Sequence, residues 1–325
     1  MSTKKIRWGI ISTGRIARKF AAATKLLPDA ELVAVGSRSQ DTADVFGDAH
    51  GVPRRHASYE DLVVDPEVDA VYVATPHPFH RPNTVLALEA GKHVLCEKPL
   101  AVNVGEATEM VRVAREKGLF LMEAMWTRFL PVWVDIKARL DSGELGGIAS
   151  LQANFGVPMP ADEARIHEPG LAGGGLLDLG IYPISLASWL LGKPKTVSSW
   201  ATMTKTNVDE RTAMLFSYAG GSFAMLSSAI DVWTTCEAEI VTEKAFIRAR
   251  RLWHEAQSYE VVNPDGSDVV TKPFENGFQF QISHTMNRIR RGQTESEVMP
   301  LDESLEIMRT MDALRAEWGF KYPFE

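Results

Sequence analysis

Apolar and polar positions alternate at two different periods along this chain, and the change comes close to Met122. Before it, short apolar runs predict buried strands, and helix-period stretches follow them. The predicted strands are Ile6 to Ser12, Glu31 to Ser37, Ala70 to Ala74, His93 to Cys96 and Leu119 to Met122. The predicted helices are 13–26, 40–47, 61–64, 82–90 and 104–117. This alternation predicts a parallel sheet with helices on both faces, as in an α/β Rossmann domain.

After Met122 the period changes to two. A helix is expected from Val132 to Leu140, and Tyr218 to Phe223 predicts a hairpin, because paired glycines accept the positive φ of primed turns. The extended runs are 148–156, 196–206, 211–218, 222–230 and 237–242, and closing helices are expected at 277–291 and 301–318. The pattern predicts an α+β second domain on an open, mostly antiparallel sheet. We place the domains at 1–123 and 124–325.

Composition excludes several classes of protein. The 325 residues carry a net charge of -7, and 45% of them are hydrophobic. No long Lys/Arg run indicates nucleic acid, and no apolar run approaches the roughly 20 residues that span a bilayer. The two cysteines form neither a disulfide framework nor a metal-ligand pattern, so no metal is expected. The N-terminus shows no signal-type apolar region. We expect a cytoplasmic protein without nucleic-acid or membrane partners.

The turn after the first strand is the candidate phosphate site. A dinucleotide fingerprint reads Gly-x-Gly-x-x-Gly/Ala between a strand and a helix, whereas this chain has Ser12 at the first glycine position. Gly14 would let the backbone approach a pyrophosphate at the helix N-terminus. The alternative is a merely structural turn. The candidate cofactor-binding residues here are Ser12, Thr13, Gly14, Arg15 and Ile16.

The end of the second strand bears on which nicotinamide cofactor is used. NAD sites usually carry an Asp or Glu here, but this chain has Ser37 and Arg38, with no carboxylate before Asp41. A guanidinium with neighbouring hydroxyls suits a 2′-phosphate. We therefore expect NADP(H) to be preferred, with NAD(H) possible. The alternative is that Arg38 is a solvated loop residue.

Two further loops should meet at the carboxyl edge of the parallel sheet. The strand His93 to Cys96 runs directly into Glu97-Lys98-Pro99, which places a lysine where doubly wound folds bind ligands. On this stretch alone, the residues fit a surface Glu–Lys pair as well as they fit a functional lysine. Thr75 and His80 follow another strand, and we assign both, with Glu97, to the cofactor side of the site. We assign no chemistry to the histidines.

A second chemical stretch opens with three glycines at 173–175 and continues as a helix to about Leu191, weakened by Pro183. Asp178 and Tyr182 are four residues apart, so a helix would place them on one face. A carboxylate and a phenol beside an approachable backbone suit a polyhydroxylated substrate. The alternative is an Asp near a helix terminus and a packing Tyr.

Three motifs together resemble the glucose–fructose oxidoreductase/inositol dehydrogenase family. They are Ser12 to Ala17, Gly91 to Pro99, and Asp178-x-Gly-x-Tyr182-Pro, and their order and spacing cover most of the chain. Within that family the sequence is most similar to dimeric dihydrodiol dehydrogenases and NADP-dependent D-xylose dehydrogenases, and Glu123 to Pro131 indicates the same branch. Inositol dehydrogenases carry His where this chain has Tyr182.

The resemblance implies Lys98 as the central catalytic group, aligned with Asp178 and Tyr182. It implies a homodimer or higher homo-oligomer through the outer face of the sheet, and a sugar, polyol or dihydrodiol as substrate. Residues implied for the substrate pocket are Trp126, Arg128 and Phe155, with Trp253 and Phe280 as weaker candidates.

The implied reaction is reversible hydride transfer between nicotinamide C4 and a carbinol carbon. In one mechanism charged Lys98 stabilises a phenolate at Tyr182, which takes the proton, while Asp178 holds Lys98 or a substrate hydroxyl. In the other, Lys98 itself carries the proton. Two other classes stay open: a nicotinamide-dependent glycosidase of the same superfamily, and a non-catalytic NADP-sensing regulator.

Overall fold

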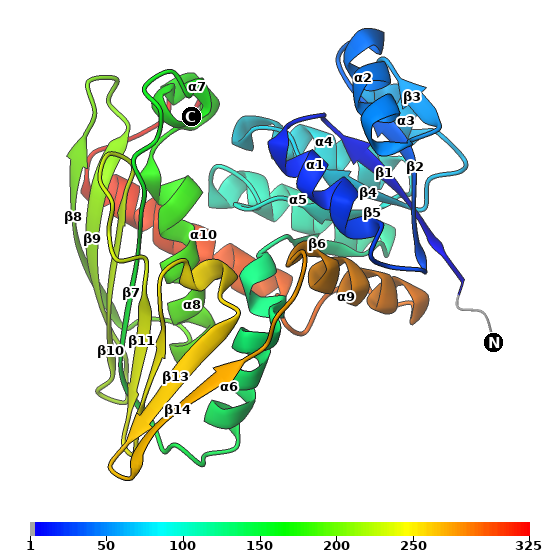
Figure 1. Cartoon of the computed structure of the whole chain (residues 1–325). Helices are drawn as coiled ribbons and strands as arrows, with labels where there is room; N and C mark the ends of the chain where they lie inside the picture. Colours follow the sequence, from blue (N-terminus) through cyan, green and yellow to red (C-terminus); the bar gives the residue numbers. More distant parts are fainter. Residues whose placement is uncertain (1–3) are drawn as a thin grey trace. The chain divides into compact units, whose positions relative to one another are not determined.

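A computed structural model describes residues 4–325 and divides the chain into two compact units (Figure 1). Unit 1 comprises Met1–Trp126 and Asn276–Leu305, and unit 2 comprises Thr127–Glu275 and Glu306–Glu325. Each unit is built around its own sheet.

Unit 1 contains a six-stranded, wholly parallel sheet in the order β3-β2-β1-β4-β5-β6. Its strands are β1 Ile6–Ile11, β2 Ala30–Gly36, β3 Arg54–His56, β4 Ala70–Val73, β5 His93–Cys96 and β6 Leu121–Glu123. Its helices are α1 Arg15–Thr24, α2 Gln40–His50, α3 Tyr59–Val63, α4 His80–Glu89, α5 Val104–Lys117 and α9 Phe278–Arg290. Strand order reverses between β1 and β4, and doubly wound folds bind ligands at such a switch point. The predicted Rossmann sheet is confirmed.

Two features of unit 1 were not predicted. Strand β3 is short and carries three charged or imidazole side chains, so its sequence shows no apolar period. Helix α9 belongs to unit 1 although it lies far along the chain: Asn276 donates to the Lys19 carbonyl at 3.0 Å, and Arg290 pairs with Asp29 at 2.7 Å. The division of the chain is therefore more complex than one boundary at residue 123.

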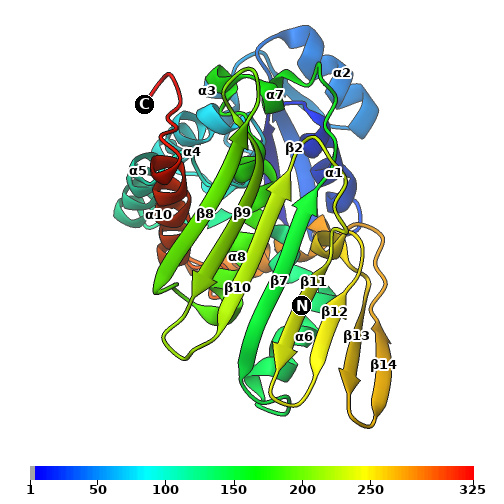
Figure 2. The ribbon, with the colours of Figure 1, turned by 90° about the vertical axis from the view of Figure 1, so that its left-hand side faces the viewer.

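Unit 2 contains an eight-stranded sheet in the order β14-β13-β12-β11-β7-β10-β9-β8 (Figure 2). Only β7 and β10 pair in parallel, which confirms a mostly antiparallel sheet. The strands are β7 Ile148–Gly156, β8 Thr196–Met203, β9 Asp209–Ser217, β10 Phe223–Ala229, β11 Ala238–Thr242, β12 Phe246–Ala249, β13 Ser258–Asn263 and β14 Gly266–Thr271. The helices are α6 Pro131–Asp141, α7 Ala164–His167, α8 Ile181–Leu191 and α10 Leu301–Glu317, which begins in unit 1.

The β9–β10 hairpin forms where the glycine pair predicted it, but with a different turn. Only Gly221 has positive φ, at +88°, and its N–H donates to the Tyr218 carbonyl at 3.1 Å. A primed two-residue turn needs positive φ at its first central position, so that part of the prediction was wrong.

Helix α8 and the π-helix Leu176–Gly180 before it pack on one face of the unit 2 sheet, against β7 and β10. The stretch Pro169–Leu191 is long and apolar enough to span a membrane, contrary to our expectation, but 78% of its most apolar window is buried in the structure. Its apolarity is accounted for by a core position. The opposite face of the sheet faces the viewer in Figure 2.

Candidate active site and cofactor site

The turn after β1 has the geometry of a phosphate site. Ser12 has φ +91°, a conformation that glycine adopts most easily, which explains why a glycine is usual at this fingerprint position. A Cβ added to Gly14 would meet only the Ser12 hydroxyl, at 3.9 Å, so the space above Gly14 is open. The first turn of α1 holds no acidic residue. These residues fit a pyrophosphate at the α1 N-terminus.

The loop after β2 presents an exposed arginine between two serines. The Ser37 hydroxyl lies 2.5 Å from the Thr42 hydroxyl, and the Ser39 hydroxyl lies 2.9 Å from the same atom and caps α2. Arg38 is exposed. Burial raises the pKa of the half-buried Tyr59 phenol, and the nearby charge of Arg38 opposes this shift. A guanidinium with hydroxyls on both sides suits a phosphate better than a ribose hydroxyl.

The loop after β5 places a partly exposed Lys98 beside a buried carboxylate. Glu97 accepts from the Tyr72 hydroxyl and, at 3.3 Å, from the Lys98 backbone N–H. Burial raises the pKa of Glu97 to about 7, against these bonds and the charges of Lys98 and Lys19. Glu97 therefore changes charge near neutral pH next to the lysine, which is typical of functional sites.

His80 ties the loops after β4 and β5 together. Its Nε2 lies 2.8 Å from the Thr75 carbonyl and its Nδ1 lies 2.7 Å from the Pro99 carbonyl. Burial lowers the pKa of His80 to about 4, so the ring is neutral at neutral pH. One ring nitrogen then donates to its carbonyl, and the other nitrogen carries no proton. Thr75 also accepts from Asn83 at 3.3 Å. His80 thus shapes the loop that carries Lys98.

Sequence reasoning missed Glu123 as a support of this loop. Its carboxylate is 1% exposed and accepts from the Leu100 N–H at 3.0 Å and from the Ser304 hydroxyl at 2.7 Å. A carboxylate directly after the predicted apolar strand Leu119 to Met122 was the available signal, because a buried charge needs partners.

In unit 2 the π-helix carries Asp178 directly into α8, which carries Tyr182. Pro183 is the third residue of α8, and the π-helix ends three residues before it. The predicted single helix therefore changes from π to α geometry just before the position where the N–H is missing. Arg165 donates to Asp178 Oδ1 at 2.8 Å, and Asp178 is 7% exposed. Arg165 was not foreseen, because it lies in a short loop helix with no apolar period.

Tyr182 lies in an aromatic cluster. The Phe155 ring is 5.3 Å from the Tyr182 ring and stacks on His254 at 4.1 Å, while Tyr182 and His254 are 5.3 Å apart. All three are buried or nearly so. His254 follows Trp253, which packs in the core and donates to the Asn154 carbonyl at 2.9 Å. The three rings form an apolar cluster that also carries the Tyr182 hydroxyl and the His254 ring nitrogens. Sequence reasoning missed His254.

Two other predicted pocket residues make contacts within their own units. Trp126 is in unit 1, 5.1 Å from Phe278, with Lys19 Nζ 4.1 Å above its ring. Arg128 is buried in unit 2 and donates to the Ser185 hydroxyl at 3.0 Å and carbonyl at 2.8 Å. These bonds give Arg128 a structural role on α8.

The geometry supports a phosphate-bearing cofactor in unit 1. In unit 2 it provides a carboxylate and a phenol on one segment. Lys98 belongs to unit 1, and Asp178 and Tyr182 belong to unit 2. Within residues 4–325 no group of three His, Cys, Asp or Glu is placed to hold a metal ion. These features define a nicotinamide-dependent oxidoreductase.

Comparison with known proteins assigns the chain within that class. Residues 6–125 match the oxidoreductase family with an NAD-binding Rossmann fold, and residues 133–248 match the GFO/IDH/MocA C-terminal domain. The chain belongs to the GFO/IDH/MocA oxidoreductase family, which confirms the resemblance and the prediction of an NAD(P)-binding dehydrogenase or reductase.

Relatives match over nearly their whole length. The chain is 36% identical to mouse trans-1,2-dihydrobenzene-1,2-diol dehydrogenase and 35% identical to the human protein, each covering 98% of both chains. The 3-ketoreductase KijD10 from Actinomadura kijaniata, solved with NADP and TDP-benzene, is 28% identical with a TM-score of 0.87, covering 96% of this chain and 98% of that one. Aldose-aldose oxidoreductase from Caulobacter crescentus shares the fold, with 24% identity and a TM-score of 0.89 over 98% and 99% of the two chains.

Proposed function

We propose that the protein is an NADP(H)-dependent dehydrogenase that transfers a hydride between nicotinamide C4 and a carbinol carbon of a sugar, polyol or trans-dihydrodiol. The observation that carries this proposal is the unit 2 segment on which the Arg165-paired Asp178 is followed by Tyr182, packed against Phe155 and His254. A cluster of rings that carries a hydroxyl and ring nitrogens suits a small substrate that has both apolar faces and hydroxyls. The names of the mouse and human relatives support a diol.

The preference for NADP(H) rests on the loop after β2. Arg38 is exposed between Ser37 and Ser39, and the first carboxylate after β2, Asp41, lies in the first turn of α2. The ketoreductase with NADP provides independent support. Ser12 to Ile16 would hold the pyrophosphate, and Thr75, His80 and Glu97 would line the side toward the nicotinamide.

Oxidation of a hydroxyl needs a proton acceptor beside the hydride acceptor, and the bound nicotinamide supplies only the hydride chemistry. A free phenol near pKa 10 is a weak base at neutral pH. We propose that the ammonium of Lys98 stabilises the phenolate form of Tyr182, which takes the hydroxyl proton. Asp178, held by Arg165, orients the substrate hydroxyl. In the rival mechanism Lys98 carries the proton and Tyr182 only orients the substrate.

The proposal is tested by following absorbance at 340 nm with a panel of trans-dihydrodiols, aldoses and polyols in the presence of NADP. We expect steady NADPH formation with at least one member. Lys98→Met should abolish turnover while NADPH still binds, and Lys117→Met, a surface lysine paired with Glu89, is the control. Full activity in Lys98→Met would overturn the role of Lys98.

Tyr182→Phe separates the two mechanisms. If Tyr182 is the base, turnover falls by about 10²–10⁴-fold. Near-normal turnover would remove Tyr182 from the acid–base step and leave Lys98 as the proton carrier. The same 340 nm assay addresses the other classes. Release of hydrolysed sugar without net NADPH change would indicate the glycosidase, and NADPH binding without any turnover would indicate the regulator.

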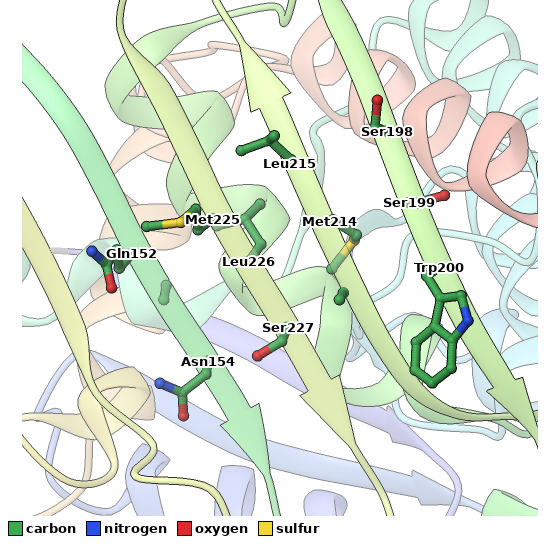
Figure 3. Close-up of a pocket in the computed structure, with 12 residues that line it drawn as sticks. Gln152, Asn154, Ser198, Ser199, Trp200, Met214, Leu215, Met225, Leu226 and Ser227 are labelled. Carbon is green, nitrogen blue, oxygen red and sulfur yellow. The ribbon is translucent and has the colours of Figure 1, made fainter.

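We also propose a homodimer through the open face of the unit 2 sheet. A hollow of about 580 Å³ lies on this face, and side chains of four strands line it. Figure 3 shows these side chains on β7, β10, β9 and β8. Met225 pairs across the strands with Leu215 and Gln152, and Ser227 pairs with Ala213 and Asn154. Trp200 is 57% exposed and Leu215 is 50% exposed. An exposed apolar patch on the open face of a sheet is typical of an interface, and a two-fold axis would bury the same patch on both copies.

The oligomeric state is tested by light scattering coupled to gel filtration. We expect a dimer for the natural chain and a monomer for Trp200→Glu combined with Leu215→Glu. Val64→Glu, at a position 70% exposed in unit 1, is the control and should remain dimeric. A monomeric natural chain would reject the interface. We further propose a cytoplasmic location, supported by Cys96 and Cys236, which are buried and form no disulfide.

A further inference from the structure

The π-helix of unit 2 begins at a turn of three glycines, Gly173 to Gly175, which is held on both sides by residues far away in the sequence. The Tyr322 hydroxyl donates to the Gly173 carbonyl at 2.8 Å. The Asp209 carboxylate accepts from the Leu176 N–H at 2.5 Å and from the Gly175 N–H. Leu176 precedes Asp178 by two residues, so both anchors act at the start of the segment that carries Asp178 and Tyr182.

The turn also fits its surroundings closely. Gly174 has φ +111°, and a Cβ there would lie 2.2 Å from Asp209 Oδ1. A Cβ on Gly173 would lie 2.4 Å from the Ile166 carbonyl. A side chain would collide with the Asp209 carboxylate at Gly174 and with the Ile166 backbone at Gly173, so both positions require glycine. The position of the turn is therefore determined by Asp209 and by the neighbouring backbone.

Tyr322 is itself held by neighbouring side chains. Tyr322 is 2% exposed, and the Arg315 guanidinium lies 4.9 Å from its ring centroid. The Glu325 carboxylate accepts from the Tyr322 N–H at 3.0 Å and pairs with Arg315 at 2.6 Å. Burial, and next the charge of Asp209, raise the pKa of Tyr322 well above its ordinary value, so the phenol keeps its proton and donates throughout the neutral range. Asp209 is fully buried at the start of β9.

We infer that Asp209 and Tyr322 are positioning residues, which fix the glycine turn and thereby place Asp178 and Tyr182 for the reaction. This inference rests on the proposed function, because it takes Asp178 and Tyr182 to be the reacting pair. Asp209 and Tyr322 act only through the backbone of the turn. A displacement of about 1 Å at a reacting group can cost up to about 100-fold in rate, so two hydrogen bonds to the backbone are enough to matter.

The test compares Tyr322→Phe with Tyr259→Phe. Tyr259 is another buried phenol of unit 2, and its hydroxyl donates to Asp135 away from the turn. We expect Tyr322→Phe to lower kcat about tenfold and to leave the NADPH dissociation constant unchanged within about twofold. Amide hydrogen exchange in peptides covering 174–182 should become faster in this variant. In Tyr259→Phe, kcat and the exchange of 174–182 should both stay at natural values.

Asp209→Asn is the second variant, because an amide keeps the shape but weakens acceptance from two N–H groups. We expect the same loss of kcat and the same faster exchange at 174–182. Unchanged exchange at 174–182 in both variants overturns the inference, as does a kcat in both that matches Tyr259→Phe. The exchange measurement needs no substrate. If the natural chain shows no turnover, the proposed function fails, while the exchange at 174–182 still decides the inference about the anchors.

Discussion

Substitution of Gly174 by alanine tests the close packing of the glycine turn against Asp209. The change adds one methyl group at φ +111°, 2.2 Å from a carboxylate oxygen of a residue that is fully buried. The backbone strain alone costs about 1–2 kcal/mol. Relief of the contact must displace the Asp209 carboxylate, which adds about 1–3 kcal/mol for overpacking and about 1–3 kcal/mol for weakened hydrogen bonds to the turn.

Gly143→Ala is the matched control for this substitution. Gly143 also lies in unit 2 with φ +75°, and no atom of residues 4–325 that could obstruct a Cβ lies within 4 Å of it. It therefore incurs only the backbone cost. The additional 2–6 kcal/mol or so at Gly174 corresponds to a melting temperature lower by about 3–9 °C than that of the control. Thermal unfolding followed by circular dichroism measures the difference. Equal melting temperatures for the two variants would refute the packing argument.

Further expectations concern unit 1. Arg38→Ala should raise the NADPH dissociation constant about 10–100-fold and leave that of NADH nearly unchanged, because a charge-assisted bond contributes about 1.5–3 kcal/mol. Fluorescence titration measures both constants, and an equal loss for both cofactors would contradict a 2′-phosphate site. Burial raises the pKa of Glu97 from 4.5 to about 7, so the folded chain binds more protons than the unfolded chain between these values. The unfolding free energy should therefore fall by up to about 3 kcal/mol as pH rises from 4.5 through 7, and more gently in Glu97→Gln. Parallel pH profiles of melting temperature would contradict this assignment. Glu123→Gln should lower turnover more than it weakens NADPH binding, because it weakens the hydrogen bond from the Leu100 N–H in the loop that carries Lys98. Steady-state kinetics and a binding titration measure the two effects separately.

Elements bounded by local signals could be predicted from the sequence. Helix α5 begins after Asn103, whose side chain accepts from the Glu106 N–H at 2.9 Å, and it ends at Gly118 with φ +63°. Both caps are readable from residue type. Strand β5 is a short, largely buried apolar run that leads into Glu97, and its bounds agree with the prediction. In these segments local preference and tertiary environment agree.

Strands β12, β13 and β14 could not be predicted in the same way. They lie toward one edge of the sheet, where β12 and β13 bury alternate residues over only four and six positions and five of the six residues of β14 are exposed. Their pairing is set by neighbours; Arg248, for example, bonds Glu239 at 2.6 Å across β11 and β12. Sheet preference depends on such context more than helix preference does.

The same distinction holds for the candidate site. Residue types and spacing made Lys98, Asp178, Tyr182 and the turn after β1 candidates, and the family resemblance implied their roles. The residues that support them come from distant positions, such as Asp209 at Leu176 and Ser304 at Glu123. A local sequence pattern gives neither the partner residue nor its distance, so these contacts could be found only from the structure.

Transfer of deuterium from substrate to cofactor tests the central claim most directly. A trans-dihydrodiol or an aldose, deuterated at the carbinol carbon that is oxidised, would be incubated with the protein and NADP, and the NADPH recovered for nuclear magnetic resonance. The account predicts one deuterium at nicotinamide C4 for each substrate oxidised, and none with Lys98→Met. Oxidised product with no deuterium at C4, or hydrolysed sugar with NADP unchanged, would contradict it.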